Sequence, residues 1–144
     1  IRLIMNISFC LIKIETLQFA VLSEDITDGK FNVISEFQFG ISPDKANMQC
    51  VGTFVFVNSK DTKVLKLQVA CYFSIIPTDI ENLKQEDGSY KIPVDFLRHL
   101  AMILVGTSRG ILFAKTESMA ANKLYLPLIN LTEVIKDDFV VKGD

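Results

Sequence analysis

Four stretches of alternating apolar and polar residues fill the first half of the chain. They cover residues 9–22, 31–41, 48–58 and 64–76, and short polar segments separate them. A period of two is typical of a β-strand with one buried face. Because parallel neighbours need long crossover connections, these strands are expected to follow one another in an antiparallel sheet. The first connecting segment carries Asp28-Gly29, a turn signal.

The first of these stretches changes parity halfway along. Lys13 and Glu15 mark one side of the strand, and beyond Thr16 that same side becomes apolar. An extra residue in a strand produces such a switch, so we expect a β-bulge near Thr16. The apolar residues that follow on this side are Leu17, Phe19 and Val21.

The third stretch is apolar on both faces. Phe54 and Phe56 lie on one side, and Val51, Val55 and Val57 lie on the other. A single layer of helix can cover only one of these faces. The other set therefore indicates self-association or a binding surface.

Helical patterns follow a polar connection at 77–92 that has no regular pattern. Apolar residues in 94–113 have helical spacing, and Arg109-Gly110 is expected to end or kink that helix. Asn130 is a suitable N-cap for a short second helix. The predicted fold class is α+β: one domain over 1–144, with a four-stranded antiparallel sheet followed by a long helix at about 93–113 and a short one at about 130–137.

The centre of the long helix is too apolar to serve one sheet face alone. Six consecutive apolar residues, "LAMILV", surround the helix, whereas one stripe is enough to cover a sheet. We therefore expect a second subunit on the outer side, in an oligomer. The alternative is a helix wrapped by the 77–92 connection and the C-terminal tail. The predicted interface residues are Leu100, Ala101, Met102, Leu104 and Val105.

The residue types that carry chemistry are sparse. His99 is the one histidine, the three cysteines are far apart, and no nucleophile, zinc or phosphate-loop motif occurs. The sequence predicts no catalytic residue, no metal site and no cofactor, and it argues against an enzyme. A net charge of −2 without a basic stripe argues against nucleic acid, and the lack of a long uncharged apolar run argues against membrane insertion. An odd cysteine count fits a reducing compartment, so a cytoplasmic location is expected.

The order of these elements, together with the stretch from Phe96 to Ile135, resembles the SecB-like family of export chaperones. Family members end the long helix at a Gly-containing turn, continue through an apolar segment with proline, and enter the last helix at a Val/Ile-Asn-Phe/Leu triplet. Here the turn corresponds to Arg109-Gly110, the proline to Pro127 and the triplet to Ile129-Asn130-Leu131.

The resemblance implies an ATP-independent chaperone that binds non-native polypeptides. It implies a homotetramer, a dimer of dimers, whose long helices lie between two sheets. It also implies apolar grooves beside the sheet, the loop between the helices and the last helix. In this chain the groove residues would be Phe54, Phe56, Phe113, Tyr125, Leu126, Pro127, Leu128, Leu131, Val134 and Ile135.

Three functions stay open. The first is a general chaperone, with protein export as one setting. Contact with the export motor is not expected, because fourteen residues follow Asn130 and the chain is only mildly acidic, whereas family docking uses a longer tail and a strongly acidic surface. The second is a dedicated chaperone of a single partner, such as an antitoxin. The third is a domain that binds a small apolar ligand between sheet and helix.

Overall fold

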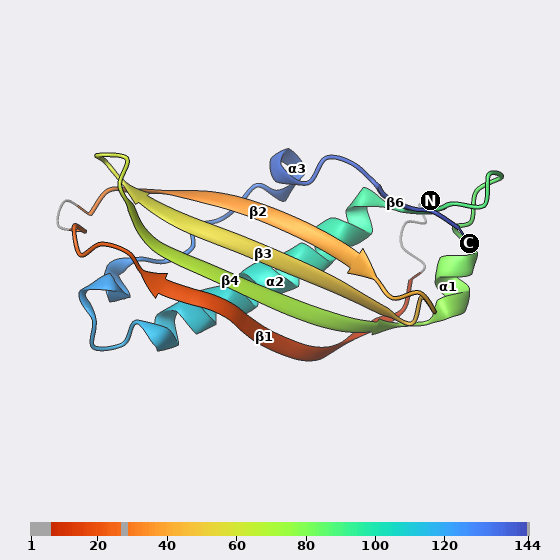
Figure 1. The fold of residues 1–144 in the computed structure, drawn as a ribbon, viewed down its shortest axis with the longest axis horizontal. Helices are drawn as coiled ribbons and strands as arrows, with labels where there is room; N and C mark the ends of the chain where they lie inside the picture. The colour runs from red at the N-terminus through yellow and green to blue at the C-terminus, as the bar shows by residue number, and fades with distance from the viewer. Residues whose placement is uncertain (1–6, 27–28, 144) are drawn as a thin grey trace.

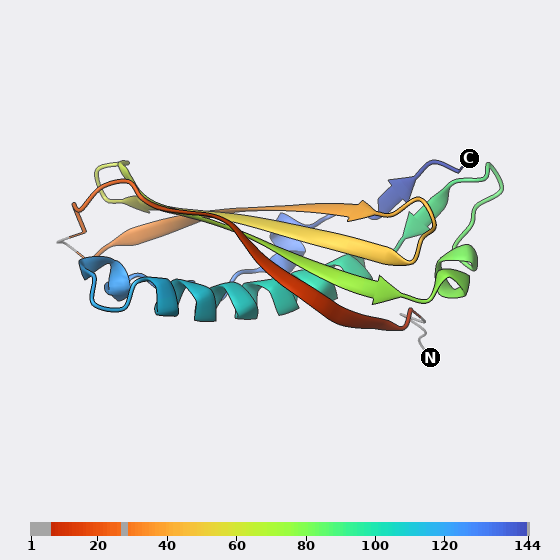
Figure 2. The same cartoon turned by 60° about the horizontal axis from the view of Figure 1, so that its bottom comes forward.

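A computed structural model describes residues 7–26 and 29–143 (Figure 1). One long helix, α2, runs along one face of a four-stranded antiparallel sheet, as the turned view shows (Figure 2). The predicted α+β class is confirmed. The elements are β1 (Phe9–Val21), β2 (Phe31–Ile41), β3 (Asn47–Asn58), β4 (Lys63–Ile75), α1 (Pro77–Glu81), β5 (Tyr90–Ile92), α2 (Val94–Lys115), the 3-10 helix η1 (Ala120–Lys123), α3 (Leu131–Val134) and β6 (Phe139–Val141).

The strand order is β1-β4-β3-β2, so β1 and β2 form opposite edges of the sheet. The sequence led us to expect that each strand would pair with the next one along the chain. This is wrong for β1, which pairs with β4, so the connection from β1 to β2 crosses the end of the β3–β4 hairpin. There the Leu22 N–H donates to the Val64 carbonyl at 2.8 Å, and the Asn58 side-chain amide donates to the Asp25 carbonyl at 3.0 Å. Burial explains the order, because β3 and β4 are the most apolar strands and take the centre. Asp28 lies outside the described residues.

Strand β1 carries two irregularities in its pairing with β4. The register shifts between Thr16 and Gln18, which confirms the bulge predicted near Thr16. A second shift lies between Leu11 and Lys13 and was not predicted. Bulges bend a strand and increase its twist, and β1 curves away from the plane of the other strands (Figure 2).

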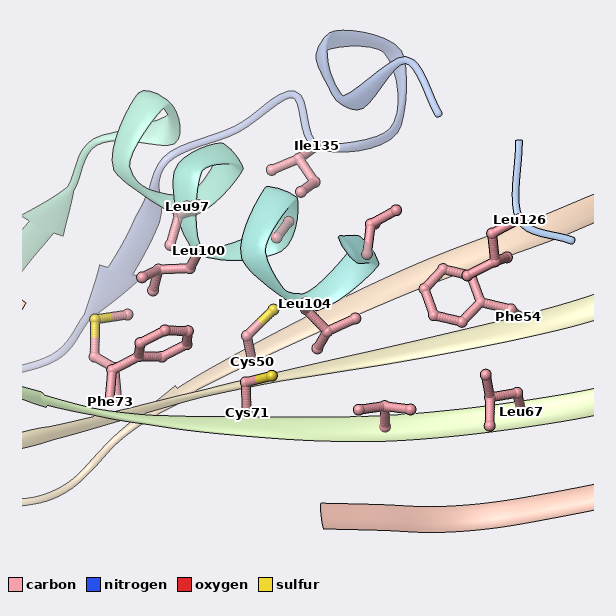
Figure 3. Packing of buried hydrophobic residues seen from close by; sticks show 14 of the residues in the cluster. Cys50, Phe54, Leu67, Cys71, Phe73, Leu97, Leu100, Leu104, Leu126 and Ile135 are labelled. Carbon is pink, nitrogen blue, oxygen red and sulfur yellow. The ribbon is translucent and has the colours of Figure 1, made fainter. Parts of the chain in front are cut away.

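The core lies between α2 and the sheet. Leu97, Leu100 and Leu104 of α2 point toward β3 and β4, as the close view shows (Figure 3). The sheet contributes Cys50 and Phe54 from β3 and Leu67, Cys71 and Phe73 from β4. Burial raises the pKa of the Cys50 and Cys71 thiols, so both stay protonated and pack as small apolar side chains.

Helix α2 continues past the position where the sequence pattern suggested its end. It runs through Gly110 to Lys115, and the Thr116 N–H donates to the Leu112 carbonyl at its C-terminus. The prediction of an end or kink at Arg109-Gly110 is therefore wrong. Gly110 sits on the outer surface with open space around it, so it neither caps the helix nor permits a close contact within the chain. By length and hydropathy α2 is the one helix of the described residues that could cross a membrane, and one side of it packs on the sheet.

The polar connection and the C-terminal helix also differ from expectation. Residues 77–92 contain α1 and β5, and β5 pairs with β6 in a second small sheet, with Ile92 opposite Phe139. The predicted helix at 130–137 is a single turn, α3. Asn130 caps it as predicted, accepting from the Thr132 N–H at 3.2 Å. The helix stops because Ile135 is extended and buried.

The face of the sheet away from α2 has no cover in the described chain. Val51 and Val55 lie there half-buried, beside polar pairs that cross the strands. The Tyr72 hydroxyl donates to the Glu15 carboxylate at 2.8 Å, and this bond raises the pKa of Tyr72. Val51 and Val55 stay near the surface as expected, whereas Val57, the third member of that predicted set, is buried next to a register shift between Phe56 and Val57.

Candidate polypeptide-binding groove

A groove of about 560 Å³ separates the start of β2 from the segment 123–130. We call it the β2 groove. In Figure 1 the blue segment that follows η1 runs toward α3 on the β2 side of the sheet. The lining residues are Gly29, Phe31, Asn32, Val33, Phe56, Lys123, Tyr125, Pro127, Leu128, Ile129 and Asn130.

The segment 123–130 has one buried and one exposed side. Leu124 and Leu126 point into the core and are at most 4% exposed. Tyr125 and Leu128 are 72% and 96% exposed beside the groove. The two buried leucines hold the segment against the core. The exposed side chains of Tyr125 and Leu128 then form a groove wall whose apolar surface is available to a ligand.

The structure brings four of the predicted groove residues together. Tyr125, Pro127 and Leu128 form one wall, and the ring of Phe56, almost fully buried, contributes to the lining from β3. Lys123 and the β2 residues Phe31 and Val33 were not predicted as lining, because they meet the segment that carries Leu128 only in the folded chain.

Three other predicted groove residues belong to the core. Phe54, Leu126 and Ile135 are buried, and in Figure 3 Leu126 lies over Phe54 while Ile135 lies near α2. The expectation that they line the groove is wrong, because their side chains fill the space between α2 and the sheet.

The remaining three predicted groove residues lie on helical surfaces outside the groove lining. Phe113 is 60% exposed near the end of α2. Leu131 is half-buried and Val134 is exposed, and both belong to the single turn of α3.

Two arginines of α2 hold the C-terminal segment in place. Arg109 donates from Nε to the Leu126 carbonyl at 3.0 Å and from Nη2 to the Pro127 carbonyl at 3.1 Å. Arg98 donates from Nε to the Ile135 carbonyl at 2.9 Å. Sequence reasoning missed both residues. Their spacing of about three helical turns, which puts them on one side of an otherwise apolar helix, was the available signal.

Replacing Arg109 by alanine is expected to loosen the groove wall more than the core. Two hydrogen bonds from a charged donor are lost; one is only partly buried and the other is exposed, so together they contribute less to global stability than the about 1.5–3 kcal/mol of each shielded bond of this kind. Limited proteolysis should therefore cleave near Tyr125 several-fold faster, while the unfolding midpoint changes little. Arg109→Lys, which keeps the charge but not the planar fork, should be intermediate. An unchanged cleavage rate in both variants would contradict this role.

The apolar run of α2 does not face both sides as the sequence suggested. Leu100, Ala101, Leu104 and Val105 are buried against the chain's own sheet, so the prediction that they form an oligomer interface is wrong. Met102, at 60% exposed, is the one predicted interface residue on the surface. The outer side of α2 carries Met102, Gly106, Gly110 and Phe113, with open space beside both glycines.

Groups that could support catalysis or metal binding are dispersed in the described residues. No cluster of three or more His, Cys, Asp or Glu side chains is placed there to hold a metal ion. The ring of His99 packs edge-on against Phe9, with ring centroids 5.5 Å apart. Among the residues that the structure describes, Lys123 is the one charged residue that lines the β2 groove, and the rest of this lining offers apolar contact and polar backbone and amide groups.

Comparison with known proteins gives structural relatives only. No protein-family model matches the chain, and no curated protein matches it. Its structure is similar to that of the SecB-like chaperone Rv1957 of Mycobacterium tuberculosis, solved in complex with a ChAD peptide from the Rv1956 HigA1 antitoxin. The TM-score is 0.54 at 16% identity, over 84% of this chain and 90% of that chain.

A protein of unknown function from Streptococcus agalactiae gives a TM-score of 0.41 at 15% identity, over 86% of this chain and 98% of that chain. The similarity to the mycobacterial chaperone concerns architecture: a four-stranded antiparallel sheet, one long helix on its face and short helices. The chain therefore has a SecB-like fold.

Proposed function

We propose that this protein is an ATP-independent chaperone that binds non-native polypeptide in the β2 groove. The observation that carries the proposal is the wall of Tyr125, Pro127 and Leu128, exposed apolar residues on a segment anchored by buried leucines and by Arg109. The SecB-like neighbour, a chaperone solved with a bound peptide, supports the same class of ligand. The proposed setting is the cytoplasm, with protein transport as one role.

A dedicated chaperone of one partner is the second candidate. It is favoured by the neighbour, whose structure holds a peptide from an antitoxin. The two candidates differ in the number of clients. Affinity purification from the native host followed by mass spectrometry would give many unrelated proteins for a general chaperone and one dominant protein for a dedicated one.

We further propose that the protein works as a homo-oligomer, a dimer of dimers. The exposed stripe of α2 that contains Met102 and Phe113 is one apolar surface that a second copy would cover. Exposed apolar side chains of β1 form another, including Ile12 at 56% exposed. Light scattering should give a mass near four times the 16.2 kDa of one chain, and a monomer would contradict the proposal.

The test of chaperone function is suppression of aggregation of a chemically denatured enzyme diluted into buffer. We expect the wild-type protein to suppress aggregation at stoichiometric amounts without ATP. Leu128→Ser should weaken client affinity about tenfold or more, because burying a leucine side chain contributes about 1.5–3 kcal/mol and 1.4 kcal/mol is a factor of ten. Stability should hardly change, because Leu128 is 96% exposed.

Val140→Ser is the matched control for Leu128→Ser. Val140 is also an exposed aliphatic residue, at 58%, but it lies on β6, away from β2 and outside the groove lining. It should suppress aggregation as well as wild type. The groove would be excluded as the binding site if both variants lost activity equally, and the chaperone proposal would fail if wild type left aggregation unchanged.

A further inference from the structure

Strand β2 is a long edge strand beside the β2 groove. It is the terminal strand of the order β1-β4-β3-β2 and contains 11 residues, which span about 35 Å at ~3.3 Å per residue. Its pairing with β3 runs from Phe31 opposite Asn58 to Ile41 opposite Met48 without a register shift. Within the described part of the chain, no other strand pairs with its outer edge. The edge is therefore continuous and regular.

The outer edge belongs to the odd-numbered residues of β2. The Ser42 N–H donates to the Asn47 carbonyl at 2.9 Å, so these two residues form a hydrogen-bonded pair that continues the ladder. In an antiparallel ladder such pairs recur at every second residue. The backbone groups of Asn32 and Ile34 therefore face β3, and those of Phe31 and Val33 face outward.

The same residues also direct their side chains toward the groove. Phe31 and Val33 line it, and Phe31, Val33, Phe37 and Phe39 pack against the core on the α2 side. Each of these four residues thus offers an outward N–H, an outward C=O and an apolar side chain; Ser35, between them, offers the same backbone groups with a polar side chain. Backbone hydrogen bonding and apolar contact are available at the same place.

The opposite edge of the sheet does not offer this geometry. Strand β1 has register shifts after Leu11 and after Thr16, and bulges at an edge interrupt the regular row of donors and acceptors. The β2 edge has none in its 11 residues. Of the two edges, β2 is the one suited to continuous pairing.

The far wall of the groove is also an extended backbone. Leu124 and Asn130, at the ends of this wall, have extended φ and ψ angles. The wall is positioned by the guanidinium of Arg109, which bonds the carbonyls of Leu126 and Pro127. The groove is therefore a slot between a free strand edge and an extended segment that presents Tyr125 and Leu128.

We propose that the client occupies this slot as an added β-strand, paired through its main chain with the outer edge of β2. The proposal rests on the chaperone function above and specifies how the same site recognises its ligand. The alternating partial charges of the outward N–H and C=O groups of Phe31, Val33 and Ser35 are complementary to one partner chemistry, an extended polypeptide backbone. Main-chain pairing tolerates many sequences, and the apolar lining favours segments with an apolar residue at every second position.

Val33→Pro tests the pairing directly. Proline removes the outward N–H of residue 33 but no bond to β3, and an edge strand accepts proline where its N–H faces outward. Val33→Ala is the control, because it keeps the N–H while losing more of the apolar side chain than proline does, so a weaker proline variant cannot be explained by lost apolar contact. The probe is reduced, carboxymethylated lactalbumin, which stays unfolded, and binding is measured by fluorescence anisotropy. We expect Val33→Pro to bind at least fivefold more weakly than Val33→Ala.

A second measurement uses the wild-type protein and does not depend on the variant folding. Amide hydrogen exchange in β2 is followed by NMR with and without saturating lactalbumin probe. An added strand should slow exchange at Phe31, Val33 and Ser35, whereas Asn32 and Ile34, already paired with β3, should change little. This alternation is the signature of strand addition, since general shielding by a bound chain would slow both sets.

The outcomes separate the two levels of the proposal. Weak binding by Val33→Pro together with alternating protection supports strand addition. Equal affinity of the proline and alanine variants, or unchanged exchange at the odd-numbered residues in the saturated complex, overturns strand addition and leaves the chaperone function standing. If the wild-type protein does not bind the probe, that result contradicts the proposed chaperone function and, with it, strand addition.

Discussion

Replacing Phe73 by alanine is expected to lower the free energy of unfolding by about 3–5 kcal/mol, the range for removing a buried aromatic side chain. Phe73 lies on the central strand β4 and is fully buried. Its ring packs edge-on against Phe9, with centroids 5.8 Å apart, and its cross-strand neighbour on β3 is Met48. Because the ring lies among core side chains of β1, β3 and β4, its removal leaves a cavity, and the loss is expected to lie within that range.

Urea denaturation followed by circular dichroism would measure this loss. Tyr125→Ala is the matched control, because it removes an aromatic ring from a site that is 72% exposed and lies outside the α2 stripe. It should change the stability by less than about 0.5 kcal/mol, as is usual for surface positions. Similar losses for the two variants would show that Phe73 does not occupy the core position described above.

Replacing Gly52 by alanine is expected to destabilise the protein by about 1–3 kcal/mol through overpacking. Gly52 lies on β3 directly beneath α2, and a Cβ atom there would come within 2.4 Å of Leu104 Cδ2 and 3.1 Å of the Phe54 ring. Leu104 and Phe54 are both fully buried, so neither side chain can swing out into solvent. The helix would have to move away from the sheet.

A double-mutant cycle with Leu104→Ala tests that cause. Removing the leucine opens the space that the new methyl group needs, so the double variant should be less destabilised than the sum of the two single variants by at least about 0.5 kcal/mol. Gly40→Ala on β2 is the control, because its nearest neighbour would be Gln49 Oε1 at 3.7 Å, an ordinary contact. If the two single losses added within error, the close approach of Leu104 would not be the cause.

Local patterns in the sequence predicted the parts of the fold that depend on neighbouring residues. The four strands lie within one residue of their expected bounds, because alternation records which side chains face the core. The bulge near Thr16 was predicted because the apolar residues change from one side of the strand to the other there. The cap at Asn130 was predicted because it depends only on the Asn130 side chain and the Thr132 N–H. Each of these features depends only on residues that are close together in the sequence.

Features that depend on distant partners could not be predicted in the same way. The pairing of β1 with β4 follows from competition among all four strands for central positions, and the β5–β6 pair joins Tyr90 to Val141 across most of the helical region. The extent of the candidate groove was missed for the same reason, because Phe31 and Val33 meet Leu128 only after the chain has folded. Tyr125 and Leu128 were predicted because the family resemblance implies a groove beside the apolar segment with proline, which the sequence shows as "KLYLPLIN".

The arrangement of the two edge strands bears on how the protein is made. Strand β1 leaves the ribosome first, but its partner β4 is the last strand of the sheet, with Phe9 opposite Ile75. Synthesis proceeds at about 5–20 residues per second, so β1 waits for several seconds with its apolar residues exposed, and such non-local pairing also slows folding itself. During its own synthesis this protein therefore passes through the kind of aggregation-prone state from which we propose that it protects other chains.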